Sequence, residues 1–229
     1  HDEYWTGAQR AAVERARDSG VALAFFGGNS MYWRARWEDS PVDETSNPRT
    51  LVCFKESWSG GKADPSPQWT GTWRDDSPEA RQQPGVRPEN ALIGTAYTSN
   101  SGSFPLSVPA ALGRMRLWRE TVVAEQSPGS ALHLGSSLVG YEFDEDLDNG
   151  WRPDGLIRLS RTSERVHEYL VDDGTHVVPS RAVHRVTMYR ASSGALVFSA
   201  GTIQWAWGLG MRHAGDPEVA DGHLMTSDP

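Results

Sequence analysis

The first residues of the chain carry the side chains best suited to chemistry. His1, Asp2 and Glu3 place an imidazole and two carboxylates within three residues, directly before a segment predicted to be a helix. In open α/β sheets, functional groups gather where a strand ends and the next helix begins. A histidine and a glutamate two residues apart can reach one metal ion or one substrate there. On spacing alone, a polar segment that caps the helix explains the same residues equally well.

Three further residues are candidates because of their positions at or within predicted strands. Asn29 follows a strand and a glycine pair, so it is either a turn residue or an amide donor facing the same cleft. Lys55 ends a short strand in the same way. Glu142 lies inside the apolar stretch 138–143, where a carboxylate needs a functional reason. The acidic residues that follow are predicted to form a solvated turn: Asp144, Glu145, Asp146 and Asp148.

Several common site types are excluded by what the sequence lacks. Cys53 is the only cysteine, which rules out an internal disulfide framework and a cysteine-based zinc cluster. It is flanked by Val52 and Phe54 in a predicted strand with no base beside it, so a core position is favoured over a nucleophile. The sequence contains no G-x-S-x-G elbow, phosphate-binding loop or H-E-x-x-H motif. Position 155 is glycine, where an EF-hand loop beginning at Asp144 needs its glutamate.

Composition narrows the class of partner. The 229 residues include 22 basic and 30 acidic side chains, a net charge of −8, which disfavours nucleic acid as the main partner. No run of eighteen apolar residues occurs, so no transmembrane helix is predicted. Ten tryptophans suggest aromatic-lined pockets or a carbohydrate-binding face.

The elements that must position these side chains begin with a helix over 7–18, closed by Gly20. A short apolar strand over 21–26, buried on both faces, should follow, giving half of a parallel β-α-β unit. The strand before the helix is missing, so the domain is predicted to be truncated at its N-terminus. Segment 56–90 is rich in Gly, Pro and Ser but holds three tryptophans, which predicts a long ordered loop. Strands are predicted over 31–37, 51–55, 116–123, 138–143 and 156–159. A hairpin is predicted to pair 183–191 with 195–200. The second half of the chain, 132–210, is therefore predicted to be β-rich.

Five motifs resemble those of a known family. They are His1–Trp5, Phe25–Arg34, Leu92–Thr95, Gly140–Glu142 and Gly201–Leu209, and they are similar, in the same order, to the C-terminal domain of the large subunit of N,N-dimethylformamidase. The resemblance implies that residues 1–229 are the C-terminal portion of one α/β catalytic domain, similar to the three-layer class I glutamine-amidotransferase fold with β-rich insertions. It also implies a mononuclear ferric iron, held by two tyrosines and one glutamate, that serves to hydrolyse a small amide.

Residue by residue, the resemblance assigns Glu3 as the iron-binding glutamate, with His1, Asn29 and Glu142 as the neighbouring site residues. The two tyrosine ligands of the family lie upstream of this motif, where this chain has no residues, and the Glu142 match requires a small gap. Bound iron would activate water and polarise the amide carbonyl. Glu142 would move the proton, while His1 and Asn29 would orient substrate or stabilise the oxyanion. A small apolar pocket is expected from four residues: Phe26, Trp33, Lys55 and Trp205.

The resemblance leaves the partners and the alternatives open. A homo-oligomer or a small partner subunit is expected beside the amide substrate, and the compartment is open, with the cytoplasm favoured. One alternative is a non-catalytic binding or structural module. Another is a copper site built on His1 as a processed N-terminus, with His133 or His184, in a polysaccharide oxidase. The single cysteine disfavours the copper alternative, because such secreted proteins usually carry disulfides.

Overall fold

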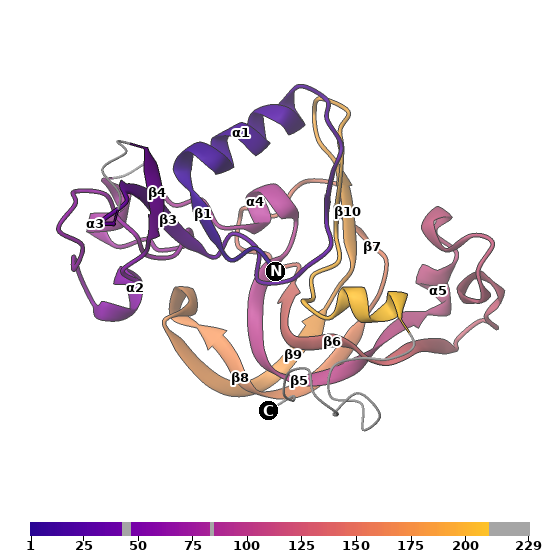
Figure 1. Ribbon diagram of the computed structural model, residues 1–229. Coiled ribbons are helices and arrows are strands. Elements are labelled where there is room, and N and C mark those ends of the chain that lie inside the picture. The colour runs from indigo at the N-terminus through magenta and orange to yellow at the C-terminus, as the bar shows by residue number, and fades with distance from the viewer. Residues whose placement is uncertain (43–46, 83–84, 211–229) are drawn as a thin grey trace.

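The computed structural model describes residues 1–42, 47–82 and 85–210, and its elements form three separate sheets (Figure 1). The strands are β1 (Tyr4–Thr6), β2 (Leu23–Phe25), β3 (Trp33–Asp39), β4 (Pro48–Val52), β5 (Ala96–Pro109), β6 (Ala131–Glu145), β7 (Ile157–Arg158), β8 (Thr162–Val171), β9 (His176–His184), β10 (Thr187–Arg190) and β11 (Leu196–Ser199). The α-helices are α1 (Gly7–Asp18), α2 (Glu56–Ser59), α3 (Pro78–Arg81), α4 (Asn90–Ile93) and α5 (Ala110–Gly113). Four 3₁₀ turns complete the set: η1 (Arg116–Trp118), η2 (Val122–Glu125), η3 (Asp172–Gly174) and η4 (Trp205–Leu209).

Each sheet draws strands from distant parts of the chain. The first has the order β1-β3-β4, with β1 and β3 parallel, and the second has the order β2-β11-β10-β7, with β2 and β11 parallel. The third is a closed ring in the order β5-β6-β9-β8, which occupies the lower half of Figure 1. The N-terminus lies near the centre of that view, beside the ends of β5 and β6.

Helix α1 has the predicted bounds because both of its ends are specified locally. The Thr6 hydroxyl accepts a hydrogen bond from the Gln9 amide at 3.2 Å, which caps the first turn. Gly20 adopts a φ of +93°, which ends the helix at little steric cost. The helix turns Val13 towards a core cluster of Trp5, Met31 and Leu92. The short strands β1 and β2 flank this helix and belong to different sheets.

The predicted three-layer α/β fold is wrong. A parallel sheet needs a crossover, usually an α-helix, for each added strand. Among the α-helices of the described residues only α1 is longer than four residues. The β1-α1-β2 segment does not return to its own sheet, because β1 pairs with β3 while β2 pairs with β11. The molecule is instead β-rich, and most of its long strands pair antiparallel in the closed ring.

Local predictions around α1 also need correction. The strand expected to be missing before this helix is present as β1. The following strand, predicted to be buried on both faces, is the three-residue edge strand β2, and its neighbours Val21 and Phe26 are 52% and 62% exposed. The side chains of β2 itself are exposed or only half-buried, so a short apolar run did not indicate full burial here.

The second half of the chain follows the predictions in part. The hairpin is confirmed, with β10 and β11 antiparallel around the 192–194 turn. Segment 116–123, predicted to be a strand, forms the 3₁₀ turns η1 and η2 instead. The prediction of a solvated acidic turn is also wrong for its first residues, because Asp144 and Glu145 are buried at the end of β6.

Segment 56–75 is ordered around one buried carboxylate. Glu56 is completely buried, and its Oε1 accepts hydrogen bonds from the Lys62 ammonium and the Ala63 and Asp64 amides, all at 2.8 Å. Its Oε2 accepts from the Thr70 amide at 2.7 Å. These bonds tie the short helix α2, which carries Trp58, to the following loop, which carries Trp69 and Trp73.

Candidate active site

Three segments of the chain bring His1, Glu3, Asn29 and Glu142 together. His1 Nε2 lies 3.6 Å from Glu3 Oε2 and 3.5 Å from Glu142 Oε2, so one imidazole faces both carboxylates. The Asn29 side-chain amide donates to Glu142 Oε2 at 3.2 Å. His1 Nδ1 lies 3.3 Å from the Gly28 carbonyl oxygen, which fixes the orientation of the ring. The result is a compact polar cluster that is only partly open to solvent.

The backbone around Asn29 explains how a short polar side chain reaches this cluster. A Cβ on Gly28 would lie 2.8 Å from Thr202 Cα, so only glycine allows this approach. Asn29 itself adopts a φ of +47°, a left-handed conformation that asparagine tolerates better than most residues. The backbone N–H of Asn29 donates a hydrogen bond to Asp144 Oδ1 at 2.9 Å. The loop between β2 and β3 is therefore pinned with Asn29 facing Glu142.

Asp144 is a site residue that the sequence analysis placed in a solvated turn. It is completely buried, its Oδ2 accepts from the Thr95 hydroxyl at 3.0 Å, and burial raises its pKa to about 6. Strand alternation could have revealed it, because Asp144 follows Glu142 by two residues and so lies on the same face of β6. Asp144 therefore supports Asn29, which in turn contacts Glu142.

Glu3 is oriented by Trp33. The Trp33 indole N–H donates to Glu3 Oε1 at 2.9 Å, which leaves Oε2 turned towards His1. Lys55 extends over the faces of three rings, with Nζ 5.1 Å from the Trp33 centroid, 5.6 Å from Tyr4 and 5.8 Å from Trp58. Trp58 was not among the predicted site residues, and it enters because the Glu56-centred loop carries it there.

The two carboxylates beside His1 have pKa values displaced in opposite directions. Burial acts to raise the pKa of both. At Glu3 the contact with His1, together with the Lys55 charge and the Asn29 amide, outweighs burial and holds the pKa of Glu3 below its usual value. At Glu142 burial dominates, and the pKa is raised despite the Asn29 hydrogen bond and the His1 charge. The neighbouring Glu3 carboxylate is the largest cause that raises the pKa of His1 to about 9. Two nearby carboxyl groups with separated pKa values are suited to different tasks.

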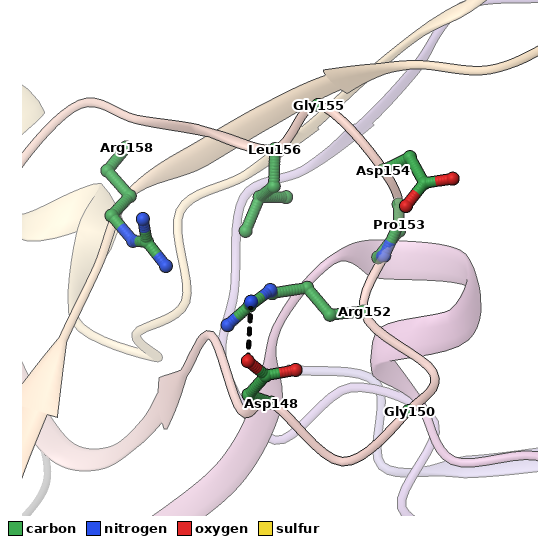
Figure 2. Close-up of a pocket in the computed structure, with 8 residues that line it drawn as sticks. All are labelled: Asp148, Gly150, Arg152, Pro153, Asp154, Gly155, Leu156 and Arg158. Carbon is green, nitrogen blue, oxygen red and sulfur yellow. Dashed lines mark hydrogen bonds and ion pairs between the residues drawn. The ribbon is translucent and has the colours of Figure 1, made fainter.

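The four predicted pocket residues do not form one wall. Trp33 and Lys55 lie on the Glu3 side of the site. Phe26 and Trp205 both pack on Phe198, with ring centroids 5.7 and 5.9 Å away. A hollow of about 400 Å³ lies elsewhere, between Asp148 and Arg158, and its lining includes none of the predicted site residues (Figure 2).

The described part of the chain bears on the predicted metal sites and on the predicted lack of a transmembrane helix. Within residues 1–42, 47–82 and 85–210, no three His, Cys, Asp or Glu side chains are grouped so as to hold a metal ion. The alternative copper partner His184 is completely buried, with Nε2 2.9 Å from the Ala200 carbonyl oxygen, and is turned away from solvent. None of the helices in the described residues has the length and apolar character needed to cross a bilayer.

Fold and cluster together define a β-rich domain in which a histidine, two carboxylates and a carboxamide meet where its sheets come together. The family described as N,N-dimethylformamidase beta subunit-like, C-terminal, matches residues 1–218. The chain belongs to this family, as its motifs predicted. No curated protein matches the chain.

Proposed function

We propose that this chain supplies the glutamate-bearing part of an iron-dependent amidohydrolase site that cleaves the C–N bond of a small amide, such as an N-alkylated formamide. The family supports the reaction class, since its description refers to N,N-dimethylformamidase. The observation that carries the proposal is the convergence of two carboxylate oxygens, Glu3 Oε2 and Glu142 Oε2, on one imidazole nitrogen of His1. This arrangement combines a hard anionic ligand with groups able to hold and move a proton.

The donor chemistry of Glu3 fits a ferric ion. Glu3 Oε1 accepts the hydrogen bond from the Trp33 indole, so Oε2 is the oxygen available as a metal ligand. Hard cations such as ferric iron prefer carboxylate oxygen. As the family resemblance implies, the chain would contribute one ligand, Glu3, and two tyrosines from outside the described residues would complete the set. When bound, such an ion supplies Lewis acidity towards the amide carbonyl and towards water.

The remaining residues divide the proton and orientation tasks. Glu142, with its raised pKa, is suited to accept a proton at Oε2 from the attacking water and to pass it to the leaving amine. His1, with a pKa of about 9, holds a proton at Nε2 at neutral pH and can donate it towards a developing oxyanion. Asn29 keeps Glu142 in place through its side-chain amide. Trp33 and Lys55 bound the site on the Glu3 side.

A partner subunit forms part of the proposal. The family is described by a beta subunit, which fits a chain that works beside another subunit, and we propose a small one or a second copy of this chain. The substrate is a small amide in either arrangement.

The test compares Glu3→Ala with Glu125→Ala in the full-length protein and its subunits. Glu125 is an exposed residue of η2, away from the site, so it controls for loss of a surface carboxylate. Iron per protein, tyrosinate-to-iron visible absorption and amine release from N-alkylated formamides are measured. We expect Glu3→Ala to lose iron and activity together while Glu125→Ala keeps both. A Glu3→Ala protein that retains iron and turnover would exclude the proposal. Absence of iron and turnover in the unmodified protein would favour the binding-module alternative.

A further inference from the structure

Strand β6 reaches Glu142 through an irregular part of its ladder with β5. Asn100 pairs with Glu142 and Ser103 pairs with Gly140, so two residues of β5 lie opposite a single residue of β6 between these pairs. Gly102, one of the two, has a φ of +85°. An extra residue in one strand is a β-bulge, which interrupts the ladder and can re-aim a side chain beside an active site. Glu142 therefore lies next to a stretch where the pairing of β5 and β6 alone holds the backbone less firmly.

The Thr202 hydroxyl binds β6 at this bulge. Thr202 is completely buried, and its Oγ1 accepts a hydrogen bond from the Gly140 N–H at 3.0 Å and donates one to the Gly140 carbonyl oxygen at 3.1 Å. A Cβ on Gly140 would lie 2.5 Å from the Gly102 carbonyl oxygen and 2.6 Å from Gln204 Oε1, so β6 is tightly enclosed at this point. A single hydroxyl thus satisfies both backbone groups of a residue that precedes Glu142 by two positions.

The neighbours of Thr202 in the chain bind β6 as well. The Asp144 N–H donates to the Gly201 carbonyl oxygen at 2.8 Å, and the Ile203 N–H donates to the Glu142 carbonyl oxygen at 3.2 Å. The segment around Thr202 is therefore a short antiparallel partner of β6, with hydrogen bonds both before and after Glu142 along the strand.

Thr202 also supports the other side of the contact that Glu142 makes. The Gly28 backbone approaches so closely that a Cβ there would lie 2.8 Å from Thr202 Cα and 3.0 Å from the Glu142 carbonyl oxygen. Asn29 follows directly, and its side-chain amide donates to Glu142 Oε2 at 3.2 Å. The loop that carries Asn29 and the strand that carries Glu142 therefore share Thr202 as a common support.

We propose that Thr202 is a positioning residue for the reaction: its hydroxyl fixes β6 at the bulge and so keeps Glu142 Oε2 in contact with Asn29 and His1. This role rests on the proposed function, in which Glu142 moves the proton. Thr202 is completely buried and acts through Glu142. A misplacement of about 1 Å caused by a distant mutation can cost about 100-fold in rate. Loss of the hydroxyl should therefore reduce turnover although it removes no group that contacts the substrate.

Thr162 provides a matched control in the same ring. It is 3% exposed, and its Oγ1 accepts a hydrogen bond from the Ser107 N–H at 2.9 Å and donates one to the Pro105 carbonyl oxygen at 3.2 Å. These bonds lie beside a second irregularity of the β5–β6 register, further along β5 than the residue that pairs with Glu142. The two threonines make the same kind of bond to the backbone, but only Thr202 lies next to Glu142.

The first experiment compares Thr202→Val, Thr202→Ser and Thr162→Val in the full-length protein with its subunits. It measures kcat, KM, iron per protein and urea unfolding. We expect Thr202→Val to lower kcat by about 10–100-fold with little change in KM or iron content. Thr202→Ser keeps the hydroxyl and should retain most of the turnover. Thr162→Val should lose as much resistance to urea as Thr202→Val, because each loses a hydroxyl that bridges a backbone N–H and C=O, but it should keep its kcat.

Two results would overturn this role: a Thr202→Val protein with unchanged kcat, or a Thr162→Val protein with the same loss of kcat. If Thr202→Val does not fold, Thr202→Ala removes the hydroxyl without placing a methyl group against Gly140, and the same two outcomes apply to it. Failure of the proposed function has a different signature, because the unmodified protein would then lack iron and turnover.

The second experiment is independent of turnover. Crystal structures of the unmodified protein and of the same variants are compared at the contact between Asn29 Nδ2 and Glu142 Oε2. We expect the two atoms to separate beyond hydrogen-bond distance in Thr202→Val and to stay in contact in Thr202→Ser and Thr162→Val. An unchanged contact in Thr202→Val would overturn the proposal whatever reaction the site performs.

Discussion

Glu56 is a completely buried carboxylate and Glu142 a largely buried one, yet their surroundings differ in one decisive respect. Glu56 accepts hydrogen bonds from one ammonium and three backbone amides, which together hold its pKa below the usual value despite burial. Glu142 has the Asn29 amide and a histidine that it shares with Glu3, and its pKa is raised. A carboxylate whose two oxygens already accept several hydrogen bonds organises the structure around it. One with spare acceptor capacity can still exchange a proton.

The largest effect that would test this comparison is expected from Glu142→Gln. Glutamine keeps the volume and the Asn29 contact but cannot take up a proton, and loss of a general acid–base group costs about 10²–10⁴-fold in rate. We expect kcat for amide hydrolysis to fall by this factor, with little change in the free energy of unfolding. Steady-state kinetics and urea unfolding on the same preparation provide the check. A large loss of stability with normal kcat would reverse the roles assigned to the two residues.

Glu56→Gln should show the opposite pattern. Removing the charge leaves Lys62 without its partner and turns one acceptor oxygen into a donor facing backbone N–H groups, which should cost about 3–5 kcal/mol of unfolding free energy. Because the pKa of Glu56 is depressed, its contribution is present above the unfolded pKa of about 4.3 and is lost as the pH falls through the lower folded value. Urea unfolding at pH 7 and at a series of pH values below the unfolded pKa measures both effects. Residual activity per folded molecule should remain, which distinguishes this variant from Glu142→Gln.

The sequence carries different amounts of information about these two carboxylates, for physical reasons. Glu142 was identifiable because an acidic residue interrupts an apolar strand, a local signal. Glu56 has no such signal: its partners at 62, 63, 64 and 70 come together only through a loop that lacks periodicity. Likewise α1 was predicted to the residue from its helical spacing, whereas the 14-residue strand β5 is too polar to indicate burial. Strand β1 pairs with β3 and strand β2 pairs with the distant β11, and no local sequence pattern specifies these pairings.

His184 extends the comparison to a buried base. Its ring is completely buried against Phe143, Nε2 contacts the Ala200 carbonyl oxygen, and Nδ1 has no partner among the described residues. Burial lowers its pKa from 6.5 to about 4, so the unfolded chain binds a proton more readily than the folded one. Stability is therefore lost as the pH falls below about 6.5 and continues to fall until about 4, by ~3 kcal/mol in total. In urea unfolding, His184→Gln should be less stable at pH 7 but should lack this part of the pH dependence. An unchanged difference between the two proteins from pH 7 to pH 4.5 would contradict the assignment.

The smallest expected effect concerns how Glu3 is held. Trp33→Phe removes the indole N–H that binds Glu3 Oε1 while keeping an aromatic ring beneath Lys55. If Glu3 is an iron ligand, losing this outer hydrogen bond should weaken iron binding by about 10–100-fold. Competition with a chelator in the full-length protein measures the affinity, and the visible absorption band reports the ligand field independently of turnover. Trp73→Phe is the matched control, because Trp73 is equally buried but its indole nitrogen has no partner among the described residues. Both variants lose similar core volume, so a difference in iron affinity between them isolates the hydrogen bond to Glu3. Equal affinities would mean that Glu3 is positioned by His1 and the backbone alone.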